Sequence, residues 1–463
     1  MIQEPQAPKP VARTLATDAL AGVLTAAVFY AEYTGLGAVL GAALPGRTSA
    51  ALGGLMVIGA VVVSSLLALA VRQPFIAGPR AASLAVLIFG MTFAVEHASA
   101  QEGRFVAAMA AMATMLVVAA ATLLLGLVPA MQRFIDGSHV ALRKGFVFAT
   151  AVGIVVGLSA AQLDGCLRVS PLLTTAIAVI SVGAALGWAH ICHRAKLNRL
   201  WQAKLAPLSM LLGVSVATLG YYVFINESVR DGLCGTLGSV GLQFGQLKEL
   251  IVGPSTFKLA ANYLPWWVWL MLIAIGVLQG GVLLLESLTT LSDRKGPTGT
   301  AFWASQLKIR ALVNLLCAPL GFASSSLSTS RTSALLEAHG KTRWAVLFHG
   351  VALLAILFFC SAWIAKLPNL AVAVALALVA TQMIDDETRH AVWRDGYAPT
   401  ASTVSMNVTW MFWCVLGLGV LAGSVLRYFD LGFGGGPLIA LVVGAMAMAA
   451  FAHRAGSRQN ESA

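Results

Sequence analysis

The chain has 463 residues, of which 58% are hydrophobic and only 11% are charged. Soluble domains usually carry about 25% charged residues, so this composition excludes an ordinary soluble protein and indicates a surface that faces lipid. The net charge of +11 would suit a nucleic-acid-binding protein. The Lys and Arg residues, however, stand between apolar segments and form no basic stripe, so we predict no nucleic acid partner and attribute the charge to membrane topology.

Apolar segments follow one another almost without pause from Ala19 to Phe451. A spanning helix needs about 20 apolar residues, which divides the chain into roughly fourteen candidates. They cover 19–43, 51–71, 80–98, 105–130, 145–162, 171–191, 205–225, 264–291, 307–319, 330–339, 341–365, 368–384, 405–427 and 433–453. The first residues lack the apolar stretch of a signal peptide, so we expect cytoplasmic tails at 1–17 and 454–463 around one membrane domain at 18–453.

Positive charges gather in the connections that would lie inside if the amino terminus is cytoplasmic. One such connection carries Arg294, Lys295, Lys308 and Arg310. The positive-inside rule therefore predicts a multi-pass protein of the inner cell membrane with both termini in the cytoplasm. Cys166 and Cys234 would then lie in outer loops, where they either form a disulfide in an oxidising periplasm or remain two free thiols.

The segment that follows Arg72 is irregular for a membrane span. Two prolines and a glycine precede its helical run, and Arg80 stands where that run begins. Irregular backbone at membrane depth is tolerated only where protein buries it or where it lines a cavity. An extended piece from Pro74 to Gly78, followed by a helix that starts near Pro79, would point free backbone N–H groups into the protein, where they could bind an anion.

A second irregular segment lies in the other half of the chain. There a Ser-rich run leads to Arg331, and Ser328, Thr329 and Ser330 are candidate N-caps for a short helix. Both irregular segments come third in their seven-span halves, as an inverted-repeat transporter requires. The alternative is that Arg80 and Arg331 only extend to the membrane interface.

Two carboxylates lie inside predicted spans, at corresponding positions of the two halves. They are Glu32 in VFYAEYTGLG and Glu286 in QGGVLLLESLTTL. An isolated carboxylate in lipid is costly or stays protonated, so each should face the interior near a cation or carry a proton. A fixed salt bridge to Arg80 or Arg331 remains the structural alternative.

These residues resemble the sulfate permease family of anion transporters. The most specific stretch is SLSTSRTSALLEAHGKTRWA, from Ser326 to Ala345, which is similar to the family's tenth span and the turn after it. Glu286-Ser287 resembles the eighth span, and Asn314 with Gly321 fits the ninth. DALAGVLTAAVFYAE from Asp18 resembles the first span, and FIAGPRAAS resembles the Gly-Pro element of the third.

The resemblance implies an all-α membrane protein of fourteen segments in two inverted seven-span repeats, at about 18–226 and 264–453. A core domain (spans 1–4 and 8–11) would move against a gate domain (5–7 and 12–14).

The anion would lie between half-helices of spans three and ten. The implied substrate-binding residues are Phe29, Gly78, Pro79, Arg80, Ser330 and Arg331. Glu32 and Glu286 are the implied proton-coupling residues, and a homodimer is compatible with the family. Three departures from the family pattern are an arginine at position 80, where many members have an apolar or small residue, Ala31-Glu32 in place of the first-span Pro-Gln pattern, and the short segment after Phe451, from which we expect no regulatory STAS domain.

The function predicted from these features is secondary active transport of a small anion, such as sulfate, bicarbonate, chloride or a dicarboxylate. Proton symport or exchange by an elevator mechanism is expected, with protons and membrane lipid as the other partners. Two rival hypotheses are a nucleobase permease of the same fold and an uncoupled anion channel or sensor. No HxxxH, GxSxG or CxxC pattern occurs, so we predict no enzyme activity, no cofactor and no metal site.

Overall fold

The structure is a computed structural model of the chain. It describes residues 11–45, 49–70, 74–128, 160–194, 208–225, 234–236, 248, 250–292, 300–360, 363 and 365–383. Among these residues, five helices are long and apolar enough to cross a membrane. They are α1 (Val11–Ala42), α2 (Ser49–Leu67 with a 3₁₀ turn after it), α4 (Arg104–Leu125), α8 (Pro171–Arg194) and α14 (Trp266–Ser292). The chain is therefore a multi-pass membrane protein.

Shorter helices complete the described fold. Four apolar ones are α3 (Ala81–Glu96), α10 (Leu208–Phe224), α17 (Arg343–Phe359) and α19 (Asn369–Met383). The others are α7 (Ala160–Val169), α13 (Pro254–Tyr263), α15 (Thr300–Leu320) and α16 (Thr329–Glu337). With only nine residues, α16 is too short to cross a bilayer by itself, because a helix rises about 1.5 Å per residue.

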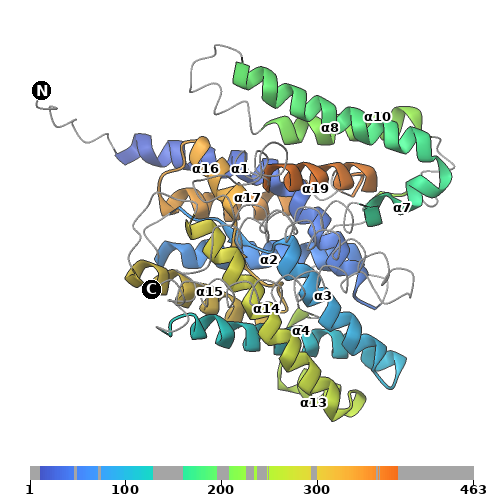
Figure 1. Ribbon diagram of the computed structural model, residues 1–463, viewed down its shortest axis with the longest axis vertical. Coiled ribbons are helices and arrows are strands. Elements are labelled where there is room, and N and C mark those ends of the chain that lie inside the picture. Colours follow the sequence, from blue (N-terminus) through green and yellow to red (C-terminus); the bar gives the residue numbers. More distant parts are fainter. Residues whose placement is uncertain are drawn as a thin grey trace, which may run out of the picture.

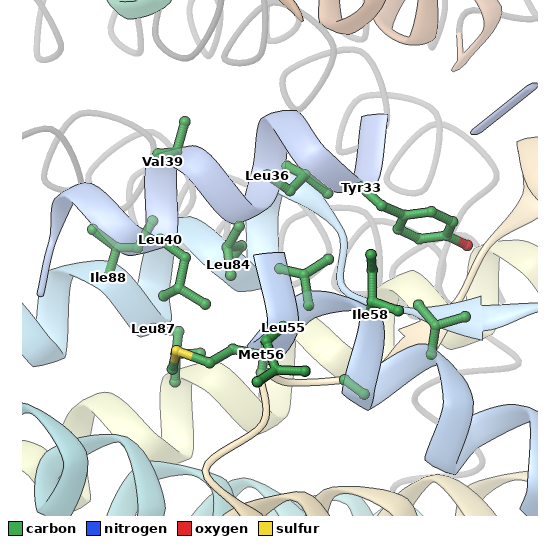
Figure 2. Close-up of a cluster of buried hydrophobic side chains, with 14 of the residues drawn as sticks. Tyr33, Leu36, Val39, Leu40, Leu55, Met56, Ile58, Leu84, Leu87 and Ile88 are labelled. Atoms are coloured by element: carbon green, nitrogen blue, oxygen red, sulfur yellow. The ribbon is translucent and has the colours of Figure 1, made fainter. Parts of the chain in front are cut away.

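The helices pack in two groups (Figure 1). The larger group contains α1 to α4 and α14 to α17, with α1 packed against α2 and α17, and α4 packed against α3, α14 and α15. Its centre is an apolar cluster to which α1, α2 and α3 each contribute side chains (Figure 2). At Gly37, where α1 approaches α2, a Cβ atom would lie 2.5 Å from the Cα of Gly54, so only glycine allows the two helices to pack this closely.

The smaller group contains α7, α8, α10 and α19. In Figure 1 the green helices α8 and α10 lie side by side, away from the larger group. Contacts between the two groups run mainly through α1, which touches α19 and α10, and through α16, which touches α19. The two groups share one continuous apolar core, since the cluster around α1, α2 and α3 also includes side chains of α8, α10 and α19.

Two short strands cross near the middle of the larger group. β1 (Ala77–Gly78) and β2 (Ser326–Leu327) pair antiparallel, with Ala77 opposite Leu327 and Gly78 opposite Ser326. These strands are the only β structure with a ladder in the described part of the chain. They lie directly before α3 and α16, so both irregular segments consist of an extended piece that leads into a short helix. The pairing satisfies backbone groups that lipid could not.

Several predicted boundaries differ in the structure. Helix α1 begins at Val11, inside the tail expected at 1–17, and α3 begins at Ala81 because Pro79 and Arg80 are still extended. Arg310, predicted in an inner connection, instead lies within α15 and is 1% exposed. The candidate spans at 145–162, 405–427 and 433–453 lie wholly or almost wholly outside the described residues, and so does the tail at 454–463.

A disulfide joins Cys166 to Cys234, whose Cα atoms are 4.3 Å apart. Of the two alternatives left open by the sequence, the structure therefore has the bridge. It ties α7 to the segment after α10, and the Tyr221 hydroxyl on α10 donates to the Cys234 carbonyl over 2.5 Å. Cys192 and Cys317 are buried free thiols.

The disulfide can be checked by alkylation. In a variant with Cys192, Cys317, Cys360 and Cys414 replaced by Ser, a membrane-impermeant maleimide should label nothing until a reductant is added. Both thiols are only 1% exposed in the folded protein, so the reduced protein should be labelled slowly, and from the outer side, where the predicted orientation places them. Labelling of the unreduced protein would contradict the bridge, and labelling only from the inner side would contradict the predicted orientation.

Candidate anion-binding site

Arg331 is the centre of the candidate site. It lies in the first turn of α16, and Ser328 is the N-cap of that helix, with its Oγ accepting from the Arg331 backbone N–H at 3.5 Å. The side chain of Arg331 is completely buried. The guanidinium thus adds its charge to the positive end of the helix dipole inside the protein, and does not extend to a membrane interface.

The guanidinium is bound by Glu32 from α1. Arg331 Nε donates to one carboxylate oxygen over 3.1 Å, and Nη2 donates to the other over 2.5 Å. Such two-point pairing of Arg with a carboxylate is strong and fixes the relative orientation of both groups. Of the possibilities left open for Glu32, the structure therefore has the salt bridge to Arg331, which links residues 299 positions apart.

Two more groups surround the same guanidinium. Nη2 also donates to the Pro79 carbonyl at 2.8 Å, so the residue directly after β1 contributes a backbone oxygen. The ring of Tyr33 lies 4.3 Å from the guanidinium carbon, within cation–π distance. The Tyr33 hydroxyl is 3.1 Å from Nε2 of His349 on α17, which holds the ring in place.

One nitrogen of Arg331 remains available. Nη1 is buried and has no hydrogen-bond partner in the part of the chain that the structure describes. It lies beside Gly78, where a Cβ atom would come within 3.2 Å of Nη1 and within 2.7 Å of the side chain of Val61. Glycine at this position therefore leaves one side of the guanidinium uncovered. A buried N–H donor without a partner is costly, which makes Nη1 the natural contact for a small anion.

The N-terminus of α3 also faces a carboxylate of the chain. Glu286 on α14 accepts from the Ser83 backbone N–H at 3.4 Å and from the Ser326 hydroxyl at 2.5 Å. Arg80, the N-cap of α3, donates to the Leu327 carbonyl on β2 at 3.4 Å. Two carboxylates thus occupy positions that would favour anions, one at the start of α3 and one against the arginine of α16.

The structure brings together four of the predicted site residues: Glu32, Gly78, Pro79 and Arg331. The other predicted residues lie around this group. Phe29 is buried on α1 one turn before Glu32, the Ser330 hydroxyl lies 3.3 Å from that of Ser328, and Arg80 and Glu286 lie at the start of α3.

Sequence reasoning missed Tyr33 and His349. The only signs of a role in the site were a tyrosine next to Glu32 and a histidine in an apolar span. Neither sign reveals a contact between residues 316 positions apart.

Asp18 positions the site from a distance. One of its carboxylate oxygens accepts from the Lys341 backbone N–H at 2.9 Å, and the other accepts from the Thr342 hydroxyl. These bonds attach the turn after α16 to α1, the helix that carries Glu32. Asp18 is the first residue of the stretch that resembles the family's first span. Its hydrogen bonds to the turn after α16 explain why an aspartate at this position is useful to the fold.

The Glu32–Arg331 pair predicts a strong coupling in stability. Removing either partner alone, by Glu32→Ala or Arg331→Ala, leaves a buried charge and should cost about 3–5 kcal/mol of stability. The double variant should lose clearly less than the sum of the two, which a double-mutant cycle measures. Arg343→Ala on α17, where the side chain donates to the Leu69 carbonyl, is the matched control and should add to Glu32→Ala without coupling. Additive losses for the Glu32 and Arg331 variants would contradict the buried pair.

Comparisons with known proteins agree with this fold. Residues 307–398 match the sequence model of the sulfate permease family, and no curated protein matches the chain by sequence. The transmembrane domain of the cyanobacterial bicarbonate transporter BicA is similar in structure, with a TM-score of 0.61 and 14% identity over 94% of this chain and 97% of that one. The murine anion transporter Slc26a9, in an inward-facing state, gives a TM-score of 0.60 and 12% identity over 97% of this chain and 70% of that one.

At identities this low, the two solved structures establish a common fold and do not identify the substrate. The family match adds information of a different kind, because it comes from sequence and includes α16 with Arg331. By that match over residues 307–398, and by a fold shared along nearly its whole length with BicA, the chain is similar to the sulfate permease family of membrane transporters.

Proposed function

We propose that the protein is a secondary active transporter that binds a small anion at Arg331, between the N-termini of α3 and α16, and couples its movement to a proton on Glu32. The observation that carries this proposal is the two-point contact between Glu32 and Arg331. The carboxylate holds the place that an anionic substrate would take on the guanidinium.

Competition between Glu32 and the substrate accounts for coupling. An incoming anion that displaces the carboxylate leaves Glu32 buried without its counter-charge, a state that favours the protonated acid. The neutral acid then needs no partner, and the anion balances Arg331. One proton thus enters the site with each anion, as in symport; a monovalent anion leaves the site neutral, and a dianion such as sulfate leaves it with one net negative charge.

The shape of the contact favours certain anions. The Nε and Nη2 groups of Arg331 now bind two oxygens attached to one carbon atom. Bicarbonate, a carboxylate and sulfate all offer two oxygens on one centre, so each could replace Glu32 in both hydrogen bonds. Chloride could accept from both groups only as a single point charge. We therefore place oxyanions ahead of chloride as substrates; BicA, which has the same fold, is described as a bicarbonate transporter.

Two helix groups that touch mainly along α1 and α16 support an elevator-like movement. The larger group would act as the core that carries the site, and the smaller group would act as the gate. The site residues Glu32, Pro79 and Arg331 all belong to the larger group, so it could move without breaking the contacts among them. We place the protein in the inner membrane with both termini in the cytoplasm, since the distribution of Lys and Arg favours that orientation.

Removal of Arg331 tests the site. In proteoliposomes, Arg331→Ala should lower saturable uptake of sulfate, bicarbonate, fumarate or succinate by about 30-fold or more, because one partner of a buried charge pair is lost. Arg331→Lys keeps the charge but loses the two-point contact, and should retain a smaller part of the uptake. Equal amounts of inserted protein, measured in the same membranes, are the control. Unchanged uptake by Arg331→Ala would overturn the assignment.

Glu32→Gln tests the coupling. The neutral amide imitates the protonated acid, so the variant should still move the anion down its gradient but should no longer accumulate it when the outside is acidified. Glu286 is the second candidate proton carrier, but two donors hold its carboxylate at α3, so Glu286→Gln should keep the response to pH.

Retained accumulation in Glu32→Gln would rule out its role as proton carrier. Flux of the wild-type protein that never exceeds equilibrium would favour a channel, and uptake of xanthine in place of anions would favour a nucleobase permease.

A further inference from the structure

A second buried arginine lies outside the candidate site. Arg310 is in the middle of α15 and is 1% exposed. Within the described residues, its buried Nε and Nη1 atoms have no hydrogen-bond partner, and no carboxylate forms an ion pair with it. The function proposed above does not use this charge.

Gln306 provides further donors next to Arg310. The two residues are four positions apart on α15, so their side chains are neighbours on one helix face. A long side chain on a helix leans back toward the preceding turn, which brings the guanidinium of Arg310 over Gln306. Gln306 is also 1% exposed, and its amide nitrogen has no partner either. Two adjacent buried side chains thus present unused N–H groups.

The same helix face is attached to the segment that leads into β2. Asn314, four residues after Arg310, donates to the Ser325 carbonyl at 2.9 Å and accepts from the Ser325 backbone N–H at 2.9 Å. Asn314 also donates to the Arg310 carbonyl at 2.8 Å. Next to Ser325, the Ser324 hydroxyl is fully buried and without a partner. The donors of Arg310 and Gln306 therefore belong to a polar face between α15 and this segment.

A charge in this position requires a counter-charge. A buried water molecule could accept one or two of the N–H groups, but it would not neutralise the guanidinium. Glu32 neutralises Arg331, whereas no described acid does the same for Arg310. Arg310 carries one positive charge, and its Nε and Nη1 groups and the Gln306 amide nitrogen are N–H donors without a partner among the described residues, which matches a small anion with a single negative charge.

We propose that Arg310 and Gln306 form a second anion site, distinct from the Arg331 site, that binds a small monovalent anion such as chloride as a resident ion. The ion would brace α15 against the segment that sets the position of β2 and hence the N-cap of α16. The site would stabilise the transporter, and its occupant would not have to be the transported anion.

Chloride-dependent stability tests this site independently of transport. The background is Glu32→Gln combined with Arg331→Met, which removes the first site without leaving an unpaired charge there. In this background, replacing gluconate by chloride at constant ionic strength should raise the midpoint of thermal unfolding progressively with chloride concentration. Adding Arg310→Met should abolish the rise, and adding Gln306→Leu should weaken the apparent chloride affinity about five- to tenfold, as expected for one lost hydrogen bond.

Arg310→Lys is the matched control, since it keeps the charge and should keep a weaker response to chloride. Identical curves in chloride and gluconate would overturn the proposal and would mean that water alone fills the site. A chloride response that survives Arg310→Met would also overturn it. Neither result would affect the uptake predictions for Arg331.

Crystals of the wild-type protein grown in bromide give a second test, which requires no variant to fold. An anomalous peak should lie within hydrogen-bond distance of the Arg310 guanidinium and the Gln306 amide. A structure of good quality with no peak there would contradict the proposal. A peak at Arg331 alone would support the transport site and not the second one.

Discussion

Burying the guanidinium of Arg331 imposes the strictest constraint on this structure. An ion removed from water loses its hydration, and the protein must replace that hydration with a counter-charge and well-placed acceptors. Glu32 supplies the counter-charge, Pro79 supplies a backbone oxygen, and the ring of Tyr33 covers a face of the guanidinium. These groups come from α1 and from the residue directly after β1, so the charge of one residue determines how three separate segments meet.

The crossing of β1 and β2 makes this meeting possible. A continuous helix in either place would bury its own backbone groups and leave none for an anion. Because each chain segment runs extended before its helix begins, the N-termini of α3 and α16 lie inside the protein, and Gly78 brings the backbone close to Arg331. Asp18 and Asn314 then hold the neighbouring segments to α1 and α15. The site therefore depends on polar contacts that an apolar core could not replace.

Much of this site could be predicted from the sequence, because the costs of polar groups in a membrane are large. Prolines, glycines and serines inside an apolar chain indicated both irregular segments. Of the three candidate N-caps Ser328, Thr329 and Ser330, the structure has Ser328. Glu32 and Arg331 were both recognised, and their salt bridge was one of two alternatives. The choice between them, and the bridge between Cys166 and Cys234, depended on distances between remote residues that one sequence does not contain. Arg310 was wrongly predicted in an inner connection because Lys308 and Lys295 in the same part of the sequence suggested a cluster of positive charge that sets membrane topology. Its buried position on α15 depends on which face of the helix it occupies, and one sequence does not show that.

The central claim is that a substrate anion replaces the Glu32 carboxylate on Arg331 and that Glu32 then takes up a proton. Proton uptake on binding measures this directly. Purified protein in weakly buffered solution with a pH indicator is mixed with sulfate, fumarate or succinate at a pH where these anions are themselves fully ionised. Wild-type protein should take up about one proton for each anion bound, and Glu32→Gln should bind the anion with no proton uptake. Binding to the wild-type protein without proton uptake, or equal uptake in Glu32→Gln, would contradict the account.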